Sequence, residues 1–264
     1  MSKGYLLVAT GKEYVTQAYL CAKSIRETQT ISNVSIVTSD IVPKEYTDVF
    51  DKVIDIPWLS ETESKSLFLT EQRWKVFHVT PYNETVVLDT DMIFIDDVSH
   101  WWQYMLRHSV LLTSRVNDYK RNTIKDDYYR KAFTANNLPN VYCAYHYFKK
   151  DDIALEYYKM LELICKNYKY FYKSYLPKQT PTRSSMDINH AICILATELK
   201  NYTIDSLWFT HMKSHLQSFT QPTDCWLDTI PIYADSSDIK IGNYKQAGIL
   251  HYTENKLSEV LLDD

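Results

Sequence analysis

Short apolar runs alternate with stretches of helical periodicity along the first part of the chain. The first run, at 5–9, is unbroken, as is typical of a parallel strand buried on both faces, and three further strands are predicted at 34–37, 52–56 and 85–88. Apolar residues recur at helical spacing from Tyr14 to Ile25, and a second helix is predicted over 64–79, before Pro81. This order predicts a mostly parallel sheet flanked by helices. Ligands bind such sheets at the edge where the carboxyl ends of the strands meet.

The remainder of the chain has a weaker pattern. It predicts, in order, a helix over 99–108, strands over 110–113 and 141–148, helices over 152–172 and 187–199, and a strand over 248–252. Residues 115–139 are polar and have no clean period, so we interpret them as a surface loop. Residues 200–247 are predicted to be irregular. No repeat or linker is visible, so we expect a single α/β domain over 1–264.

The glycine content excludes several common sites. Only four of the 264 residues are Gly, and no three of them are close enough to form a GxGxxG loop. The one Gly-Lys pair, at Gly11, has Leu6 five residues before it where a Walker A loop needs Gly, and a GxSxG turn is also absent. A bound nucleotide would therefore be held by other means, such as a metal ion. The net charge of −4 provides no strong basic field for nucleic acid.

Cysteine usage and the N-terminal region bear on location. The five cysteines are far apart and form no CxxC pair, which excludes a zinc ribbon or a thioredoxin motif. Their apolar surroundings are typical of reduced thiols in a core. The apolar run near the N-terminus is too short for a signal peptide or a membrane span. We therefore expect a cytoplasmic protein with no membrane span.

The most informative stretch is the apolar strand that runs directly into Asp89 and Asp91. Their spacing lets both carboxylates face the same side of an extended chain. Two carboxylates held together repel each other, and a divalent cation is the simplest compensation. Mg²⁺ and Mn²⁺ take oxygen ligands and commonly share their coordination sphere with substrate phosphates. The pair therefore indicates metal-assisted departure of a nucleotide diphosphate.

The sequence 88–92, LDTDM, resembles the DxD motif of GT-A glycosyltransferases, especially the glycogenin and galactosyltransferase-like (family 8-like) group. The resemblance implies a GT-A (Rossmann-like) fold, Mn²⁺ or Mg²⁺, a UDP-sugar donor and retention at the anomeric carbon. Residues at matching places around the nucleotide are Val8, Thr10, Tyr14 and Arg73, and the neighbouring Gly11 and Thr90 are further candidates for binding it. Arg73 stands sixteen positions before the first Asp, where the family has a basic residue aimed at the diphosphate.

Later parts of the family pattern are matched less closely. The family's Asn-Ser-Gly strand start is replaced by Tyr142-Cys143-Ala144. Asp187 matches an Asp that contacts the donor sugar, and it is the candidate catalytic residue. His251 matches the family's third metal ligand, whereas Lys256, the candidate diphosphate contact, falls one residue early because the family's Gly is missing.

Two further histidines, His211 and His215, are four residues apart, as in some zinc sites. No Glu follows His211 and no third ligand is evident, so we interpret them as structural. His251, by contrast, comes at the end of an apolar run, and its imidazole would complete a Mn²⁺ site beside two carboxylates.

The sequence thus predicts a metal-dependent glycosyltransferase, with a nucleotide-binding half at 1–114 and an acceptor-side half at 115–264. A glycan or another small hydroxyl compound is the expected acceptor. A second possibility is a hydroxymethylated base in DNA, because the composition is similar to that of proteins from large bacteriophages, which would place the protein in the host cytoplasm. A non-catalytic module that binds nucleotide sugars is the alternative from another class. A nucleotidyltransferase also uses paired carboxylates, but it usually has a glycine-rich or basic loop early in the chain.

Overall fold

The computed structural model describes residues 2–56, 72–124, 130–197, 202–212, 226–234 and 238–262. Its central sheet has seven strands in the order β3-β2-β1-β4-β8-β6-β9. Their bounds are Lys3–Val8 (β1), Val34–Val37 (β2), Lys52–Ile54 (β3), Glu84–Leu88 (β4), Val110–Thr113 (β6), Tyr142–Lys149 (β8) and Thr203–Ile204 (β9). Strands β1 to β4 pair in parallel, as do β6 and β9, whereas β8 is antiparallel to both β4 and β6. The expected α/β class with a mostly parallel sheet is confirmed.

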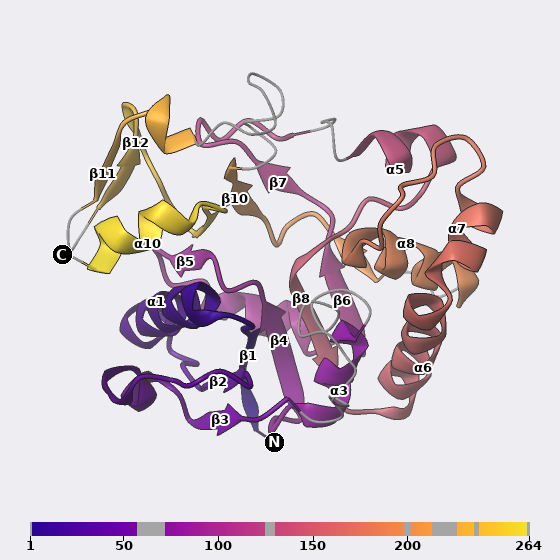
Figure 1. Ribbon diagram of the computed structural model, residues 1–264, viewed down its shortest axis with the longest axis horizontal. Coiled ribbons are helices and arrows are strands. Elements are labelled where there is room, and N and C mark those ends of the chain that lie inside the picture. The colour runs from indigo at the N-terminus through magenta and orange to yellow at the C-terminus, as the bar shows by residue number, and fades with distance from the viewer. Residues whose placement is uncertain are drawn as a thin grey trace.

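Helices pack on this sheet from two sides, with α1 beside β1 and β2 and with α6, α7 and α8 gathered beside β8 and β6 (Figure 1). The helices are α1 (Lys12–Thr28), α3 (Val76–Val79), α4 (Trp102–Met105), α5 (Lys131–Asn136), α6 (Asp152–Lys166), α7 (Tyr168–Tyr175), α8 (Met186–Ala196) and α10 (Asn255–Leu262). Single 3-10 turns lie at Lys44–Val49, Arg73–Lys75, Ser99–Trp101 and Trp226–Asp228.

Strand β1 shows why its sequence is apolar without interruption. Leu6 and Val8 belong to the hydrophobic cluster that α6 and α8 cover, whereas Tyr5, Leu7 and Ala9 belong to the cluster that α1 covers. Successive side chains of a strand point to opposite faces, so both sets are buried. All five are at most 6% exposed. The prediction of a strand buried on both faces is therefore correct.

Two smaller sheets complete the chain. One has the order β5-β14-β10-β7, formed by Met92–Phe94, Ile249–His251, Phe209–His211 and Val116–Asn117. The other is the antiparallel set β11 (Ile232–Ala234), β12 (Ile239–Ile241) and β13 (Tyr244–Lys245). Strands β11 and β12 lie near α10 at the upper left of Figure 1. Because β14 pairs with β5, the end of the chain returns to the residues that follow β4.

Several expected elements are corrected by the structure. Residues 115–139 are not only a loop, since they contain β7 and α5, and residues 200–247 contain β9 to β13. The helix predicted over 152–172 is two helices, α6 and α7, that meet at Asn167. Of the helix predicted over 64–79, residues 64–71 lie outside the described residues and the rest is a 3-10 turn followed by the short α3.

Two further expectations concern the thiols and the membrane. Four cysteines, Cys21, Cys143, Cys165 and Cys193, are buried, as expected of core thiols, and Cys225 lies outside the described residues. Among the helices that the structure describes, none has the length and apolar character that crossing a membrane requires.

Candidate active site

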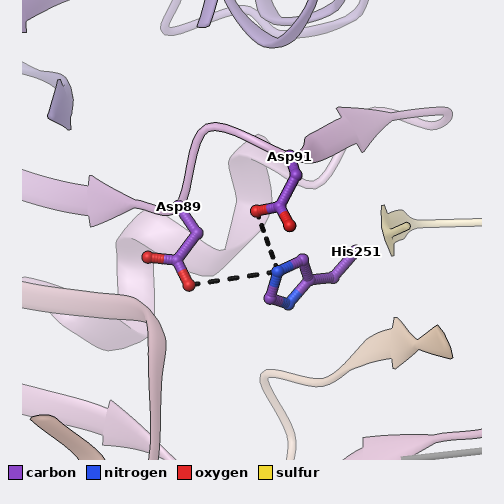
Figure 2. A group of neighbouring side chains, drawn as sticks. All are labelled: Asp89, Asp91 and His251. Carbon is purple, nitrogen blue, oxygen red and sulfur yellow. Dashed lines mark hydrogen bonds and ion pairs between the residues drawn. The ribbon is translucent and has the colours of Figure 1, made fainter. Parts of the chain in front are cut away.

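Asp89, Asp91 and His251 come together just beyond the carboxyl end of β4. Figure 2 shows the two carboxylates on the connection that follows β4, both facing the imidazole. His251 Nε2 lies 2.9 Å from Asp91 Oδ1 and 3.9 Å from Asp89 Oδ2. One ligand atom from each of the three residues lies within 4.8 Å of the others. Two carboxylate oxygens and one imidazole nitrogen are a donor set that suits Mn²⁺ or Mg²⁺.

Backbone pairing fixes the positions of these three side chains. The Asp89 N–H donates to the Ala144 carbonyl at 3.0 Å, which extends the pairing of β4 with β8 by one residue. His251 is the last residue of β14 and lies opposite Met92 of β5. The Tyr252 N–H then donates to the Asp91 carbonyl at 3.0 Å. Strand pairing thus joins an imidazole to carboxylates that lie about 160 positions away in the chain.

Thr90 faces away from its two acidic neighbours. Its side chain is 5% exposed, and its hydroxyl donates to Gln17 Oε1 of α1 at 3.1 Å. Gln17 also donates to the Asn255 side chain at the start of α10. In the structure the Thr90 hydroxyl therefore binds the turn formed by residues 89–91, here called the acidic turn, to α1 rather than lying beside the carboxylates.

Arg73 forms an ion pair with Asp89. Its Nη2 donates to Asp89 Oδ1 at 2.5 Å, and the two side chains are 12% and 27% exposed. Burial alone would raise the pKa of the Asp89 carboxyl, but the Arg73 guanidinium and then His251 outweigh it and hold that pKa below its ordinary value. Asp89 is therefore ionised at neutral pH, which is the form of a carboxylate that can bind a metal ion. The partner that the structure shows for Arg73 is thus the Asp89 carboxylate. Its contact with a diphosphate, expected from the sequence, stays a prediction.

The carboxyl ends of β1 and β2 form the adjoining part of this edge. Val8 ends β1 and pairs with Val37 of β2. Just beyond these strands, the hydroxyls of Thr10 and Ser39 are buried and have no hydrogen-bond partner among the residues that the structure describes. A buried hydroxyl without a partner is costly, so such groups commonly await a ligand or water. Ser39 is absent from the sequence prediction, although it lies only two residues after the end of β2.

Gly11 connects β1 to α1 at the same edge. Its φ of 107° is one that other residues rarely adopt, and its N–H donates to Asp40 Oδ2 at 2.7 Å. Tyr14, on the first turn of α1, is 39% exposed. The predicted nucleotide residues of β1 and α1 therefore lie at one end of the sheet, with Asp40 as an additional polar contact that the sequence analysis did not find.

Asp187 lies in the first turn of α8 and has two donors. Its Oδ1 accepts the Cys143 N–H at 2.8 Å, and its Oδ2 accepts from Arg130 Nη2 at 2.6 Å. Cys143 is next to Ala144, whose carbonyl accepts from Asp89. The start of β8 therefore links Asp187 to the acidic turn. Burial raises the pKa of the Cys143 thiol and the nearby Asp187 charge adds to this, so the thiol stays protonated.

The remaining candidates lie in different surroundings. Lys256 is exposed on the first turn of α10, beside Asn255, which contacts α1. His211, which we interpreted as structural, is 8% exposed and its ring centroid lies 4.9 Å from that of His251. It reaches this place because β10 pairs in parallel with β14, a pairing that the sequence does not reveal. His215 lies outside the described residues.

The fold defines the class: a single α/β domain with a mostly parallel sheet flanked by helices. The sequence matches no protein-family model and no curated protein. Solved structures that resemble the chain are glycosyltransferases. The glycosyltransferase GlyE of Streptococcus pneumoniae TIGR4 superposes with a TM-score of 0.51 at 12% identity over 100% of this chain and 60% of GlyE.

Two other structures were compared. The apo form of GlyE gives a TM-score of 0.46 at 12% identity over 78% of this chain and 46% of that one. The apo form of mouse xyloside xylosyltransferase 1 gives 0.48 at 9% identity over 78% of this chain and 85% of that one. The chain therefore spans only about half to three fifths of the length of the GlyE chains that it resembles. At these identities the comparison establishes the fold class.

Proposed function

We propose that the chain is a metal-dependent glycosyltransferase that moves a sugar from a nucleotide-diphosphate donor, most simply a UDP-sugar, to a glycan or another hydroxyl acceptor. The observation that carries the proposal is the convergence of Asp89, Asp91 and His251 at the carboxyl edge of the sheet. Ligands bind α/β sheets at this edge. The glycosyltransferase fold of the structural neighbours supports the same reaction class.

The donor atoms fit a small divalent cation. Asp89 is held ionised by Arg73, and His251 Nε2 faces both carboxylates. When bound, Mn²⁺ or Mg²⁺ would neutralise charge that develops on the departing diphosphate. Thr10, Gly11 and Tyr14, with the neighbouring Val8, would hold the nucleoside, and the buried Thr10 hydroxyl is a hydrogen-bonding group available for it.

The residues around the acidic turn would orient the rest of the donor. Arg73 Nη2 contacts Asp89, so its charge would also attract a diphosphate bound to a metal ion held by Asp89. Asp187 would accept hydrogen bonds from the transferred sugar, and Lys256 would approach the diphosphate from α10. Retention at the anomeric carbon remains a prediction from the family resemblance.

Binding of UDP, with and without Mn²⁺, tests the proposal directly. Isothermal titration of the wild-type chain is expected to show UDP binding that requires Mn²⁺. Asp91→Asn removes a ligand charge with little change in shape and is expected to abolish it. Asp55→Asn, a change in a carboxylate just after β3, is the control that should bind as the wild type does. Equal UDP binding by the wild type and Asp91→Asn, or no nucleotide binding at all, would refute the metal-dependent donor site.

A second candidate acceptor is duplex DNA that carries hydroxymethylated bases. The observation that favours it is the segment 163–186, which has five basic residues and no Asp or Glu in a chain of net charge −4. All five, Lys166, Lys169, Lys173, Lys178 and Arg183, are exposed. Arg130, in contrast, is buried and cannot contact DNA.

DNA binding by this segment would depend strongly on salt. Each phosphate contact that is lost lowers the slope of log K against log salt by about 0.9. Lys169→Gln/Lys173→Gln is therefore expected to reduce the slope by nearly two, and Lys23→Gln/Lys44→Gln, on other exposed surface, to leave it unchanged. No binding to duplex DNA at low salt would leave a glycan as the acceptor.

A non-catalytic module that binds nucleotide sugars would also bind UDP with Mn²⁺. Slow release of UDP from a UDP-sugar, with water in place of the acceptor, separates this alternative from an enzyme. The enzyme releases UDP from at least one of UDP-glucose, UDP-galactose, UDP-xylose and UDP-N-acetylglucosamine, and Asp91→Asn does not. Tight binding without any release would favour the module.

A further inference from the structure

Arg130 is a buried cation outside the predicted site. It lies directly before α5, in a region that the sequence pattern presents as a polar loop, and its side chain is 5% exposed. Removing a guanidinium from water is costly unless hydrogen bonds and a counter-charge replace the water. The hydrogen bonds and the counter-charge of Arg130 must therefore offset the free-energy cost of its burial.

Three kinds of contact hold the Arg130 guanidinium. Nη1 donates to the Val141 carbonyl at 2.7 Å, and Nη2 donates to Asp187 Oδ2 at 2.6 Å. The guanidinium carbon lies 3.6 Å from the centroid of the Tyr142 ring and 4.6 Å from that of Phe133. A planar, stacked fork of this kind is specific to arginine, because a lysine ammonium can neither stack nor donate in two fixed directions.

The consequence of these contacts falls on Asp187. One carboxylate oxygen accepts from Arg130 and the other from the Cys143 N–H, so neither oxygen is free to rotate away. The first turn of α8 adds the positive end of a helix dipole. A carboxylate oxygen accepts more than one hydrogen bond, and the Asp187 side chain remains 25% exposed. Asp187 thus keeps a fixed orientation and spare acceptor capacity.

Asp187 also lies close to the acidic turn. Cys143 donates to Asp187, and the adjacent Ala144 accepts from Asp89. One dipeptide of β8 therefore sets the separation between the metal-binding turn and the carboxylate on α8.

We propose that Arg130 is a positioning residue for the transfer reaction, which holds the Asp187 carboxylate as a fixed hydrogen-bond acceptor for hydroxyls of the transferred sugar. This inference rests on the proposed glycosyltransferase function. Arg130 itself touches neither the sugar nor the metal and acts through Asp187. Its loss is therefore expected to weaken recognition of the sugar and not of the nucleotide.

The chain contains a matched control for this arrangement. Arg26 donates from Nε to the Val49 carbonyl at 3.1 Å and from Nη2 to Asp51 Oδ1 at 2.9 Å. Asp51 Oδ2 accepts the Val34 N–H at 2.7 Å. The hydrogen bonds to a carbonyl and a carboxylate resemble those of Arg130, but this pair is more exposed and lies at the amino end of β2, the edge opposite the site.

The test compares Arg130→Lys with Arg26→Lys in two assays. The first is affinity for UDP and for the four UDP-sugars named above, each with Mn²⁺, and the second is the rate of UDP release. Arg130→Lys is expected to bind UDP within about two-fold of the wild type, to lose the additional affinity for the preferred UDP-sugar, and to lower kcat by about 10- to 100-fold. Arg26→Lys is expected to leave the preference for the UDP-sugar over UDP and the kcat for UDP release unchanged.

A double-mutant cycle separates positioning from a structural effect. If Arg130 acts through Asp187, then Arg130→Met in the Asp187→Asn background should cost little further activity, because the residue it positions is already impaired. Additive losses, an unchanged preference for UDP-sugar over UDP in Arg130→Lys, or equal losses for both ligands would overturn the inference. Failure of the wild type to bind UDP with Mn²⁺ is a different result and would count against the proposed function. Should Arg130→Met fail to fold, Arg130→Lys and Asp187→Asn still decide between these outcomes.

Discussion

Replacing Arg73 by Met tests how the acidic turn is stabilised. In the structure, Arg73 is the counter-charge of Asp89, and both lie among groups that exclude most solvent, with 12% and 27% of their side chains exposed. Removing one partner of a buried pair leaves an uncompensated charge and typically costs about 3–5 kcal/mol. Because a quarter of Asp89 still reaches solvent, we expect the lower end, about 3 kcal/mol, for Arg73→Met without metal.

Arg26→Met provides the comparison. This pair also joins a guanidinium to a carboxylate at 2.9 Å, but the two side chains are 31% and 34% exposed. Exposed pairs are worth about 0–1 kcal/mol, so the control should lose about 1 kcal/mol or less. Urea unfolding at pH 7.5 in EDTA measures both losses, with the slope m checked for two-state behaviour.

Adding Mn²⁺ makes the prediction sharper. A cation at Asp89 and Asp91 supplies the positive charge that Arg73→Met removes, so Mn²⁺ is expected to stabilise the variant more than the wild type. A ligand at about a hundred times its dissociation constant adds about 2.7 kcal/mol, which is large enough to measure. A loss for Arg73→Met that equals the loss for Arg26→Met, or a Mn²⁺ effect that is the same in the variant and the wild type, would refute this account of the turn.

Two further predictions follow from buried groups. Thr10→Val and Ser39→Ala remove hydroxyls that have no partner among the described residues, so the stability of the protein without ligand should stay the same or rise. Calorimetry should show that each change weakens UDP binding with Mn²⁺ by about 3- to 10-fold. Burial lowers the pKa of His146 from 6.5 to about 4. Between these values the unfolded chain binds a proton that the folded chain does not, so the free energy of unfolding falls as the pH drops from 6.5 towards 4. Urea unfolding should show a contribution of about 3 kcal/mol from His146. His190 shifts in the same direction, whereas His146→Gln should lack the part of this pH dependence that is due to His146.

Strands β1, β2 and β4 of the central sheet were predictable because each has at least four residues and is buried on both faces. Each of the segments that predicted β1, β2 and β4 is bounded by polar residues or Gly, and the observed strands begin and end within two residues of the expected bounds. Strands β9 to β13 have only two or three residues each, which is too short for an alternation of apolar and polar positions to be visible. Helix α5, with six residues, fails for the same reason.

The candidate site was predictable where it is local in sequence. Asp89 and Asp91 are two residues apart and follow a strand, so their convergence needs only the geometry of an extended chain. His251 was found through the family resemblance, since the pairing of β14 with β5 cannot be read from either strand. Arg130 was missed because a buried cation in a polar segment looks like a solvated one until its partner, Asp187, is known.

The departure from the family pattern at Tyr142-Cys143-Ala144 can be weighed from its contacts. The departure favours a non-catalytic module that binds nucleotide sugars, because all three residues of the family pattern are replaced. The structure shows that Cys143 and Ala144 act here through backbone groups: the Cys143 N–H donates to Asp187, and the Ala144 carbonyl accepts from Asp89. These bonds do not depend on the side chains, so the substitutions leave the link between Asp187 and the acidic turn in place. Of the three replaced side chains, that of Tyr142 has a clear contact, because its ring stacks on the Arg130 guanidinium. The departure therefore helps to hold Arg130, and through it Asp187, and does not indicate that the function of Asp187 is lost.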